Sequence, residues 1–441
     1  MTVPTQVLTG GGGGVNKSKL KILACASSVI GHTIPVINIV KQLISRGYDV
    51  TFIAGSDFQD RIEQMGARFI SIPSFNINEF QEERERRGSG PERIIFDLVK
   101  FFVEPTKFRK DILYKALEDI RSEYPSHNIV VLTESFYLGD HPMYLGAPLP
   151  KGFTKRPRTV NIHAVPYMMP SQDIAPFGTA LIPDYKEESR ELYRTQYKEM
   201  MDQSYAEVMK VQGETLTELG GVDYKPTFPL EILSVTADIT LQMCPPSLEY
   251  KRSDVHPKIR FAGALHTRSA KRAFIPPSFW QKITSGNKKV IVVTQGTVAM
   301  NYTHLIIPTL NALAHFPDFI VVAILGHKGA SLPADVTIPP NAHVIDYLPY
   351  DAILPYGSVF VMNAGYGGFI QGVLNGVPMV LAGSTEDKAE VSARGEYSGV
   401  AINLRTESPS ENQILEAVKG ILDDNRYKKR VIEIKQENED M

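Results

Sequence analysis

A histidine that directly follows an apolar segment is the side chain of this sequence best suited to acid–base chemistry. His32 lies in the run Gly31 to Pro35 (GHTIP), which comes after the apolar residues from Lys19 to Ser27. Because an imidazole has an unperturbed pKa of about 6.5, its neutral form can take a proton from a hydroxyl group near neutral pH. The position alone is equally compatible with a histidine that forms part of a tight turn or caps a helix.

A general base also needs a group that orients its second ring nitrogen. Two carboxylates compete for this role. Glu134 follows the apolar run from Asn128 to Thr133, and Asp140 lies six residues further along. Either could fix the tautomer of His32 and stabilise its imidazolium form. We predict Glu134 as the partner and keep Asp140 as the rival.

A glycine-rich turn in the second half of the chain is suited to an anion. The run Asn363 to Gly368 (NAGYGG) joins a predicted strand to a predicted helix over Phe369 to Leu374. Glycines let backbone N–H groups approach a ligand at a helix N-terminus, where the helix dipole favours negative charge. The turn Gln295 to Thr297 and the polar triplet Glu386 to Lys388 are expected at the same sheet edge. Together they suit a nucleoside diphosphate that carries a hydroxyl-rich group, although each glycine-rich run is also compatible with an ordinary turn.

The elements that must position these residues alternate between strand and helix. Buried strands are predicted at 19–27, 49–54, 67–72, 128–133, 159–163 and 237–243, the last of the first half, and then at 288–294, 319–325, 343–347, 359–363 and 379–382. A helix is predicted at 34–45, and the charged run 81–87 (QEERERR) predicts a solvated helical face. This pattern favours an α/β fold of two doubly wound, Rossmann-like domains facing across a cleft. We expect a flexible glycine-rich tail at 1–18, a first domain at 19–264, a linker at 265–286 and a second domain at 287–441. Ligands of such sheets bind at the carboxyl ends of the strands.

Composition and absent motifs narrow the chemistry. The 441 residues are 43% hydrophobic and carry a formal net charge of −2, which fits a globular protein and gives no electrostatic case for nucleic acid. Cys25 and Cys244 are too few for a disulfide framework, and no apolar stretch approaches the roughly 20 residues of a membrane helix. We therefore expect a cytoplasmic protein without an integral membrane segment.

Motifs for metals and cofactors are absent from the sequence. There is no P-loop, no zinc-binding His-Glu-x-x-His and no Asp-x-Asp pair, so no metal is predicted. The turn 27–35 has too few glycines for a nicotinamide cofactor. The oligomeric state is left between a monomer and a weak dimer.

Three motifs give the chain a resemblance to a known family. They are Gly31 to Pro35, the block Asp346 to Tyr350 (DYLPY), and the segment Asn363 to Lys388 with the run Gly376 to Met379 (GVPM) inside it. In order and spacing they resemble the UDP-dependent glycosyltransferases of the GT-B fold, most closely the fungal and bacterial natural-product enzymes. The similarity runs from about Lys19 to near the C-terminus.

The resemblance implies a role for each matching residue. His32 matches the catalytic base and Glu134 matches its acidic partner. Tyr347 falls where an aromatic ring stacks on uracil, the Leu348 backbone where the base edge is bound, and Gln371 where the ribose is bound. The remaining matches line the diphosphate and the sugar: Gly296, Thr297, Asn363, Gly365, Gly367 and Gly368 for the diphosphate, and Asp387 and Lys388 for the sugar hydroxyls.

Four positions depart from the family pattern. Asn363 stands where a histidine normally contacts the α-phosphate, and Lys388 stands where a glutamine is usual, which could change the sugar preference. Glu134 replaces an aspartate, so its carboxylate lies one methylene further out. The charged stretch Asn425 to Asn438 at the end of the chain predicts that the family's last helix, which returns to the first domain, is short or missing.

The resemblance implies an inverting transfer of a sugar, with glucose first, from a UDP-sugar to a hydroxyl group, with no cofactor beyond this co-substrate. The acceptor is expected in the first domain, as a lipophilic hydroxyl compound such as a phenolic or flavonoid. Its expected pocket is apolar and adaptable, lined by Phe136, Tyr137, Met143, Tyr167, Met168 and Met169. Two alternatives stay open: a UDP-sugar-binding protein with little transferase activity, and a membrane-associated sterol or lipid glycosyltransferase.

Overall fold

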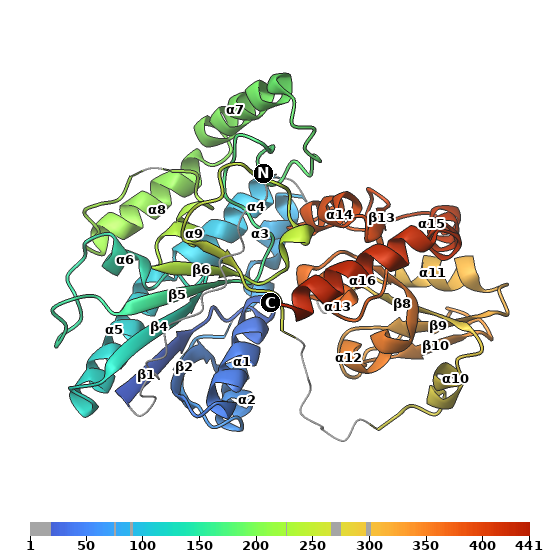
Figure 1. Ribbon diagram of the computed structural model, residues 1–441, viewed down its shortest axis with the longest axis horizontal. Coiled ribbons are helices and arrows are strands. Elements are labelled where there is room, and N and C mark those ends of the chain that lie inside the picture. Colours follow the sequence, from blue (N-terminus) through green and yellow to red (C-terminus); the bar gives the residue numbers. More distant parts are fainter. Residues whose placement is uncertain (1–18, 75, 89–90, 226, 266–274, 297–300) are drawn as a thin grey trace.

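Two α/β lobes lie side by side in the computed structural model (Figure 1), which describes residues 19–441 except 75, 89–90, 226, 266–274 and 297–300. The predicted tail at 1–18 lies outside the described residues, as does much of the predicted linker. Each lobe is built on a parallel sheet, as the sequence pattern predicts. The first lobe runs from blue to yellow-green in Figure 1, and the second from dark yellow to red.

Within the described residues, the first sheet has seven strands in the order β3-β2-β1-β4-β5-β6-β7. They are β1 (Leu20–Cys25), β2 (Asp49–Gly55), β3 (Arg68–Ile72), β4 (Asn128–Glu134), β5 (Arg158–His163), β6 (Ile239–Gln242) and β7 (Ile259–Phe261). The prediction that 237–243 ends this sheet is wrong, because β7 adds a further strand. With three residues, β7 is too short to give a hydrophobic period.

Helices cover both faces of this sheet. They are α1 (Ile30–Ser45), α2 (Gln59–Glu63), α3 (Gln81–Arg86), α4 (Pro91–Asp97), a π-helix (Leu98–Val103), α5 (Thr106–Glu123), α6 (His141–Tyr144), α7 (Glu187–Asp202), α8 (Ala206–Glu218) and α9 (Ile232–Val235). Helix α1 buries Val36 and Val40 against one face, and α5 buries Leu113 and Leu117 against the other. The apolar strands are therefore enclosed on two sides, which explains their near-continuous hydrophobic sequences.

The run Gly31 to Pro35 is helical, so its prediction as a tight turn is wrong. Helix α1 begins at Ile30, and the backbone N–H groups of His32 and Thr33 both donate to the Val29 carbonyl, at 3.1 and 2.9 Å. Pro35 is the sixth residue of α1 and lacks the N–H that would donate to the Gly31 carbonyl, and the helix continues past it to Ser45. His32 consequently lies in the first turn of α1, above the carboxyl end of β1.

The second sheet has six strands among the described residues, in the order β10-β9-β8-β11-β12-β13. They are β8 (Lys289–Thr294), β9 (Phe319–Ile324), β10 (Ala342–Ile345), β11 (Gly357–Met362), β12 (Met379–Leu381) and β13 (Ala401–Asn403). The sequence pattern predicts five of these and misses β13, again a three-residue strand.

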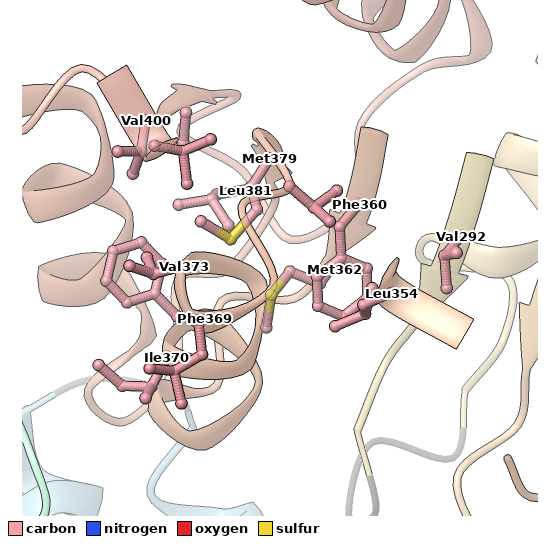
Figure 2. Close-up of a cluster of buried hydrophobic side chains, with 14 of the residues drawn as sticks. Val292, Leu354, Phe360, Met362, Phe369, Ile370, Val373, Met379, Leu381 and Val400 are labelled. Carbon is pink, nitrogen blue, oxygen red and sulfur yellow. The ribbon is translucent and has the colours of Figure 1, made fainter. Parts of the chain in front are cut away.

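Helices of the second lobe pack on both faces of its sheet. They are α10 (Trp280–Thr284), α11 (Ile306–Leu313), α12 (Tyr350–Ile353), α13 (Tyr366–Leu374), α14 (Lys388–Tyr397), α15 (Glu411–Asp423) and α16 (Asn425–Glu439). Figure 2 shows Phe369 and Val373 of α13 meeting Met379 and Leu381 of β12 in one core cluster. Phe279 and Trp280, which fall in the predicted linker, pack against this same cluster.

The expectation of a short or missing last helix is wrong. Helix α16 is formed over Asn425–Glu439, and it buries Val431, Ile434 and Asn438, which share one helical face within a charged sequence. Its end lies between the two lobes (Figure 1). There the Asn438 side chain bonds the backbone N–H and C=O of Ala264, just beyond β7, at 2.6 and 3.1 Å.

Candidate active site

His32 and Glu134 meet at the point where the strand order of the first sheet reverses. Strands β1 and β4 are neighbours there, with Cys25 paired to Thr133, so α1 after β1 and the end of β4 reach the same edge. The His32 Nδ1 atom lies 2.7 Å from Glu134 Oε1. The same carboxylate oxygen accepts the backbone N–H of Phe136 at 2.9 Å, which fixes its position.

His32 and Glu134 each stabilise the charged form of the other. Burial opposes the charged form of His32, but the neighbouring Glu134 carboxylate outweighs it and raises the pKa of the histidine above its ordinary value. Burial also opposes the charge of Glu134, whereas His32 and the Phe136 N–H stabilise it, and its pKa is lowered. Glu134 therefore remains ionised at neutral pH and can hold a proton on Nδ1.

Asp140, the rival partner, is directed elsewhere. It accepts a hydrogen bond from the Thr133 hydroxyl at 3.4 Å and is 2% exposed. Burial raises its pKa to about 7. Between the two candidate carboxylates, the structure thus brings Glu134 into contact with His32.

Two phenylalanine rings flank the histidine. The Phe136 ring centroid lies 4.9 Å from that of His32, and Phe102 of the π-helix lies 5.6 Å from it and 4.6 Å from Phe136. Sequence reasoning missed Phe102, because an apolar run gives no signal for the extra residue of a π-helical turn. A cavity of about 10 Å³ lies behind these two rings, which is barely the size of one water molecule.

The other predicted acceptor residues are more scattered. Met168 packs in the same cluster as Phe136, whereas Tyr137 packs against α5 and donates its hydroxyl to the Arg109 carbonyl at 2.9 Å. Tyr167 and Met169 form a separate small cluster with Ile259. Met143 is buried at 3% exposure. Of the six predicted residues, Phe136 is the one found in ring contact with His32.

The predicted donor site lies at the equivalent edge of the second sheet. Strands β8 and β11 are neighbours at the reversal point, with Thr294 paired to Met362. The side-chain amide of Asn363 donates to the Gln295 carbonyl at 2.6 Å and so joins the two turns that follow these strands. Gly296 has a φ of +74°, a backbone conformation that favours glycine. Thr297 lies outside the described residues.

The glycine-rich turn opens α13 as predicted. Gly365 is the N-cap residue, and Ala364 before it is held at a φ of +60°. Gly367 is surrounded by open space, so its backbone is accessible, whereas a Cβ atom on Gly368 would lie 2.8 Å from the Met362 methyl group. The exposed N-terminus of α13 can thus receive an anion through free backbone N–H groups.

The predicted base and ribose contacts occupy suitable positions around α13. Tyr347 is 47% exposed, while Leu348 beside it is buried in the core and anchors the segment. Gln371 is almost buried, and within the part of the chain that the structure describes its side-chain oxygen has no hydrogen-bond partner. This oxygen is therefore available as a hydrogen-bond acceptor.

The predicted sugar pair lies at the start of α14, where the two domains meet. Asp387 is the N-cap residue, and burial raises its pKa. Lys388 donates to the Thr385 hydroxyl at 3.0 Å and contacts Glu386. The charge of Asp387 also acts on His32, so residues of both predicted half-sites affect one another electrostatically.

Two arginines of the first domain lie close to the loop before α14, and the sequence analysis does not predict this contact. Arg93 and Arg84 lie 3.7 and 4.0 Å from the Glu386 carboxylate. Arg84 belongs to the run predicted as a solvated helical face, and that prediction is wrong for this residue, since it is 5% exposed and bonds Asp97 at 2.8 and 2.9 Å. Long-range pairing of this kind leaves no local pattern in a sequence.

Comparisons with known proteins agree with this geometry. Residues 219–440 match the family model described as UDP-glucoronosyl and UDP-glucosyl transferase. UDP-glucosyltransferase 1 of Beauveria bassiana is 53% identical over 97% of this chain and 94% of its own length. UDP-glucosyltransferase B1 of Starmerella bombicola is 36% identical over 95% of this chain and 94% of its own. The crystal structure of the glycotransferase of kitacinnamycin aligns with a TM-score of 0.68 at 18% identity, covering 95% of this chain and 94% of that one.

The two parallel-sheet domains and their structural neighbours show that the chain has the GT-B fold. With its close relatives and its family-model match, the chain belongs to the UDP-glycosyltransferase family, whose members transfer a sugar from a UDP-sugar. Among the described residues, no helix is long and apolar enough to cross a membrane.

Proposed function

We propose that this enzyme transfers glucose from UDP-glucose, with inversion at the anomeric carbon, to a hydroxyl group of a lipophilic small molecule. The observation that carries the proposal is the contact of 2.7 Å between His32 Nδ1 and Glu134 Oε1 at the reversal point of the first sheet. A protein that only bound a UDP-sugar would need no such base. The choice of glucose is supported by the names of the relatives in Beauveria bassiana and Starmerella bombicola.

The proton is transferred through the free nitrogen of His32. Glu134 accepts the Nδ1–H bond, which leaves Nε2 as the nitrogen with a free lone pair. As the acceptor oxygen attacks the anomeric carbon, its proton passes to Nε2 and an imidazolium forms. The Glu134 carboxylate stabilises this new positive charge, as the acid does in other His–carboxylate pairs.

The leaving group departs toward the second domain. The bond between the anomeric carbon and the diphosphate oxygen breaks, and UDP carries away the electron pair. The N-terminus of α13 with Gly365 and Gly367 offers backbone N–H groups and a positive dipole end to this charge. Asp387 and Lys388 are proposed to hold the sugar hydroxyls, with Tyr347 and Gln371 on the uridine.

A phenolic acceptor is supported by the surroundings of His32. The rings of Phe102 and Phe136 lie within 6 Å of the imidazole, at 5.6 and 4.9 Å, and offer apolar surface against which a planar aglycone can pack. Since a phenol also loses its proton more readily than an alkyl alcohol, it is well matched to a histidine base.

UDP release from a panel of UDP-sugars tests the proposal, with and without a mixed set of phenolic, sterol and hydroxy-lipid acceptors, in the presence of a chelator. We expect release that needs UDP-glucose and a phenolic acceptor, survives chelation and is lost in His32→Ala. The exposed His315 provides the matched control, because it precedes the amino end of β9, at the sheet edge opposite the carboxyl ends of the strands.

Calorimetric binding of UDP separates the alternatives. His32→Ala should bind UDP as the wild type does, because the base contributes nothing to the uridine or diphosphate. If UDP and UDP-glucose bind but no acceptor releases UDP, the protein is a binder with little activity. A strict preference for sterol or lipid acceptors, together with sedimentation on liposomes, would replace the phenolic assignment.

A further inference from the structure

Helix α14 carries a polar stripe that faces the first domain. Glu390, Arg394 and Tyr397 are spaced by four and three residues and so lie on one side of the helix. Glu386, four residues before Glu390, extends the stripe beyond the helix start and meets the arginines of α3 and α4. Every member of this stripe contacts a residue that lies more than a hundred positions away in the first domain.

Glu390 holds a loop of the first domain. Its Oε1 atom accepts the backbone N–H groups of Gly178 and Ala180, at 2.7 and 2.8 Å. Ala180 has a φ of +52°, a strained conformation for a residue with a side chain, which two hydrogen bonds to one carboxylate oxygen help to maintain. The second oxygen of Glu390 pairs with Arg394 at 2.7 Å.

Arg394 then joins the helix to the segments around Tyr167 and Glu249. Its Nε atom lies 2.7 Å from the Glu249 carboxylate, and its Nη2 atom donates to the Tyr167 carbonyl at 3.1 Å. The other Glu249 oxygen accepts the Tyr167 N–H at 2.8 Å. Arg394, Glu390 and Glu249 are each less than 5% exposed. At the end of the helix, the hydroxyls of Tyr397 and Tyr185 lie 2.9 Å apart.

Such a buried cluster is a poor way to gain stability. Removing charges from water costs several kcal/mol each, and well-packed apolar residues often stabilise an interface as well or better. A hydrogen-bonded array instead fixes the relative positions of the elements that it joins, because each hydrogen bond forms only within a narrow range of distances and angles. The arrangement therefore indicates that these contacts serve to fix the position of α14 relative to the first domain.

A neighbouring face of α14 packs closely on its own domain. Val391 lies in the second-domain core, and a Cβ atom on Gly395 would lie 2.6 Å from a Leu381 methyl group and 3.1 Å from the Ala401 Cβ. The helix is thus held between the two domains. Its first residues are Asp387, the N-cap, and Lys388, the proposed sugar contacts.

We propose that Glu390, Arg394 and Tyr397 are positioning residues for the donor sugar: they tie α14 to the first domain and so set Asp387 and Lys388 relative to His32. The inference rests on the proposed function, since it assigns the sugar to Asp387 and Lys388. It adds that recognition of the sugar, unlike recognition of UDP, depends on contacts with the first domain. UDP itself is proposed to bind to α13 and to the turns after β8 and β10, which this stripe does not hold.

The test compares the affinities of UDP and UDP-glucose in variants of α14. Glu390→Gln keeps an oxygen for the loop N–H groups but loses the charge that pairs with Arg394. We expect its dissociation constant and KM for UDP-glucose to rise by about 3- to 10-fold, with the affinity for UDP unchanged. Glu396→Gln is the matched control, since Glu396 is on the same helix but pairs with Arg405 of its own domain at 2.8 Å. It should leave both affinities unchanged.

The two tyrosines provide a milder second test. Tyr185→Phe and Tyr397→Phe each remove one hydroxyl of the same hydrogen bond, so both are expected to fold. Each should weaken UDP-glucose binding by about 2- to 5-fold. The double variant should be no weaker than Tyr397→Phe, because the Tyr397 hydroxyl also accepts the Lys251 N–H at 3.4 Å.

Equal loss of UDP and UDP-glucose affinity in these variants, or no loss of either, would overturn the inference. If Glu390→Gln fails to fold, the tyrosine pair decides. Because the readout is the ratio of two binding constants, it can be measured even if no acceptor is ever glycosylated. Failure of the proposed transfer reaction is therefore distinguishable from failure of this inference.

Discussion

Glu134 meets two donors with a single carboxylate oxygen, the His32 ring at 2.7 Å and the Phe136 N–H at 2.9 Å. The backbone bond holds the carboxylate in place when the histidine changes its protonation state. The Glu134 carboxylate thus raises the pKa of His32 from a fixed position.

The pH dependence of the reaction should report this pair. A base must be neutral, so kcat/KM is expected to rise with pH through the pKa of His32, which lies above its ordinary value. Glu134→Gln removes the charge that raises this pKa and leaves the burial that lowers it. The acid limb of a pH–rate profile should therefore move to lower pH, while the plateau falls by about 100-fold.

Glu134→Asp is the control for that profile, because it keeps the charge. Its limb should stay closer to that of the wild type even if its plateau falls. An acid limb that does not move in Glu134→Gln would show that this carboxylate does not tune the group that titrates.

Asp140 gives a prediction on stability rather than on rate. Burial raises its pKa to about 7, so between its ordinary value near 4 and pH 7 the folded state binds more protons than the unfolded state. The free energy of unfolding must therefore fall as pH rises through this window. Asp140→Asn should remove this contribution to the slope and, at pH 8, stabilise the protein by roughly 2–4 kcal/mol in urea titrations. Asp111→Asn, at an exposed acid, should leave the pH slope as it is in the wild type.

At the scale of elements, the donor site depends on how closely three turns approach each other. Gly383 follows β12, and a Cβ atom there would lie 2.4 Å from the Asn363 carbonyl oxygen and 2.7 Å from the Lys388 Cβ. The glycine-rich turn before α13 and the start of α14 can lie side by side only because this position has no side chain.

Alanine at two glycines should separate packing from ligand approach. Gly383→Ala is expected to lower the free energy of unfolding by about 1–3 kcal/mol and to weaken UDP-glucose binding, because backbone must move. Gly367→Ala lies in open space on a helix, so it should stabilise the fold by up to about 1 kcal/mol while weakening UDP binding through its methyl group. Chemical denaturation and calorimetry measure both. Unweakened UDP binding in Gly367→Ala would argue against a diphosphate at the α13 N-terminus.

At the scale of the whole molecule, the last helix connects the two domains. Asn438 of α16 satisfies both backbone groups of Ala264, where the chain leaves β7. Asn438→Ala leaves two part-buried backbone groups of Ala264 without this partner and should lower the free energy of unfolding by about 1–3 kcal/mol. Glu433→Ala, at an exposed position of the same helix, should change it by less than about 0.5 kcal/mol. Equal stability of both variants in urea denaturation would show that this crossing contact is dispensable.

The strands of both sheets were largely predictable because each is a short, continuous apolar run between turn signals. Helix α1 was predicted from its hydrophobic period, but its start at Ile30 was not, since the helix begins within the residues that the pattern assigned to a turn. The strands β7 and β13 escaped because three residues carry no period. Helix α16 was expected to be short because its charged residues outnumber the buried Val431 and Ile434 that hold it.

Most of the strands, and the positions of His32, Glu134, Asn363 and Gly365 after the carboxyl ends of strands, follow from the amino-acid sequence alone. These are local properties, because hydrophobic period and turn residues act over a few positions. The three-dimensional packing shows which carboxylate contacts His32, that Phe102 lies beside it and that α14 is held between two domains. Those contacts join residues far apart in the chain, and their geometry follows from strand register and domain packing, which no local pattern records.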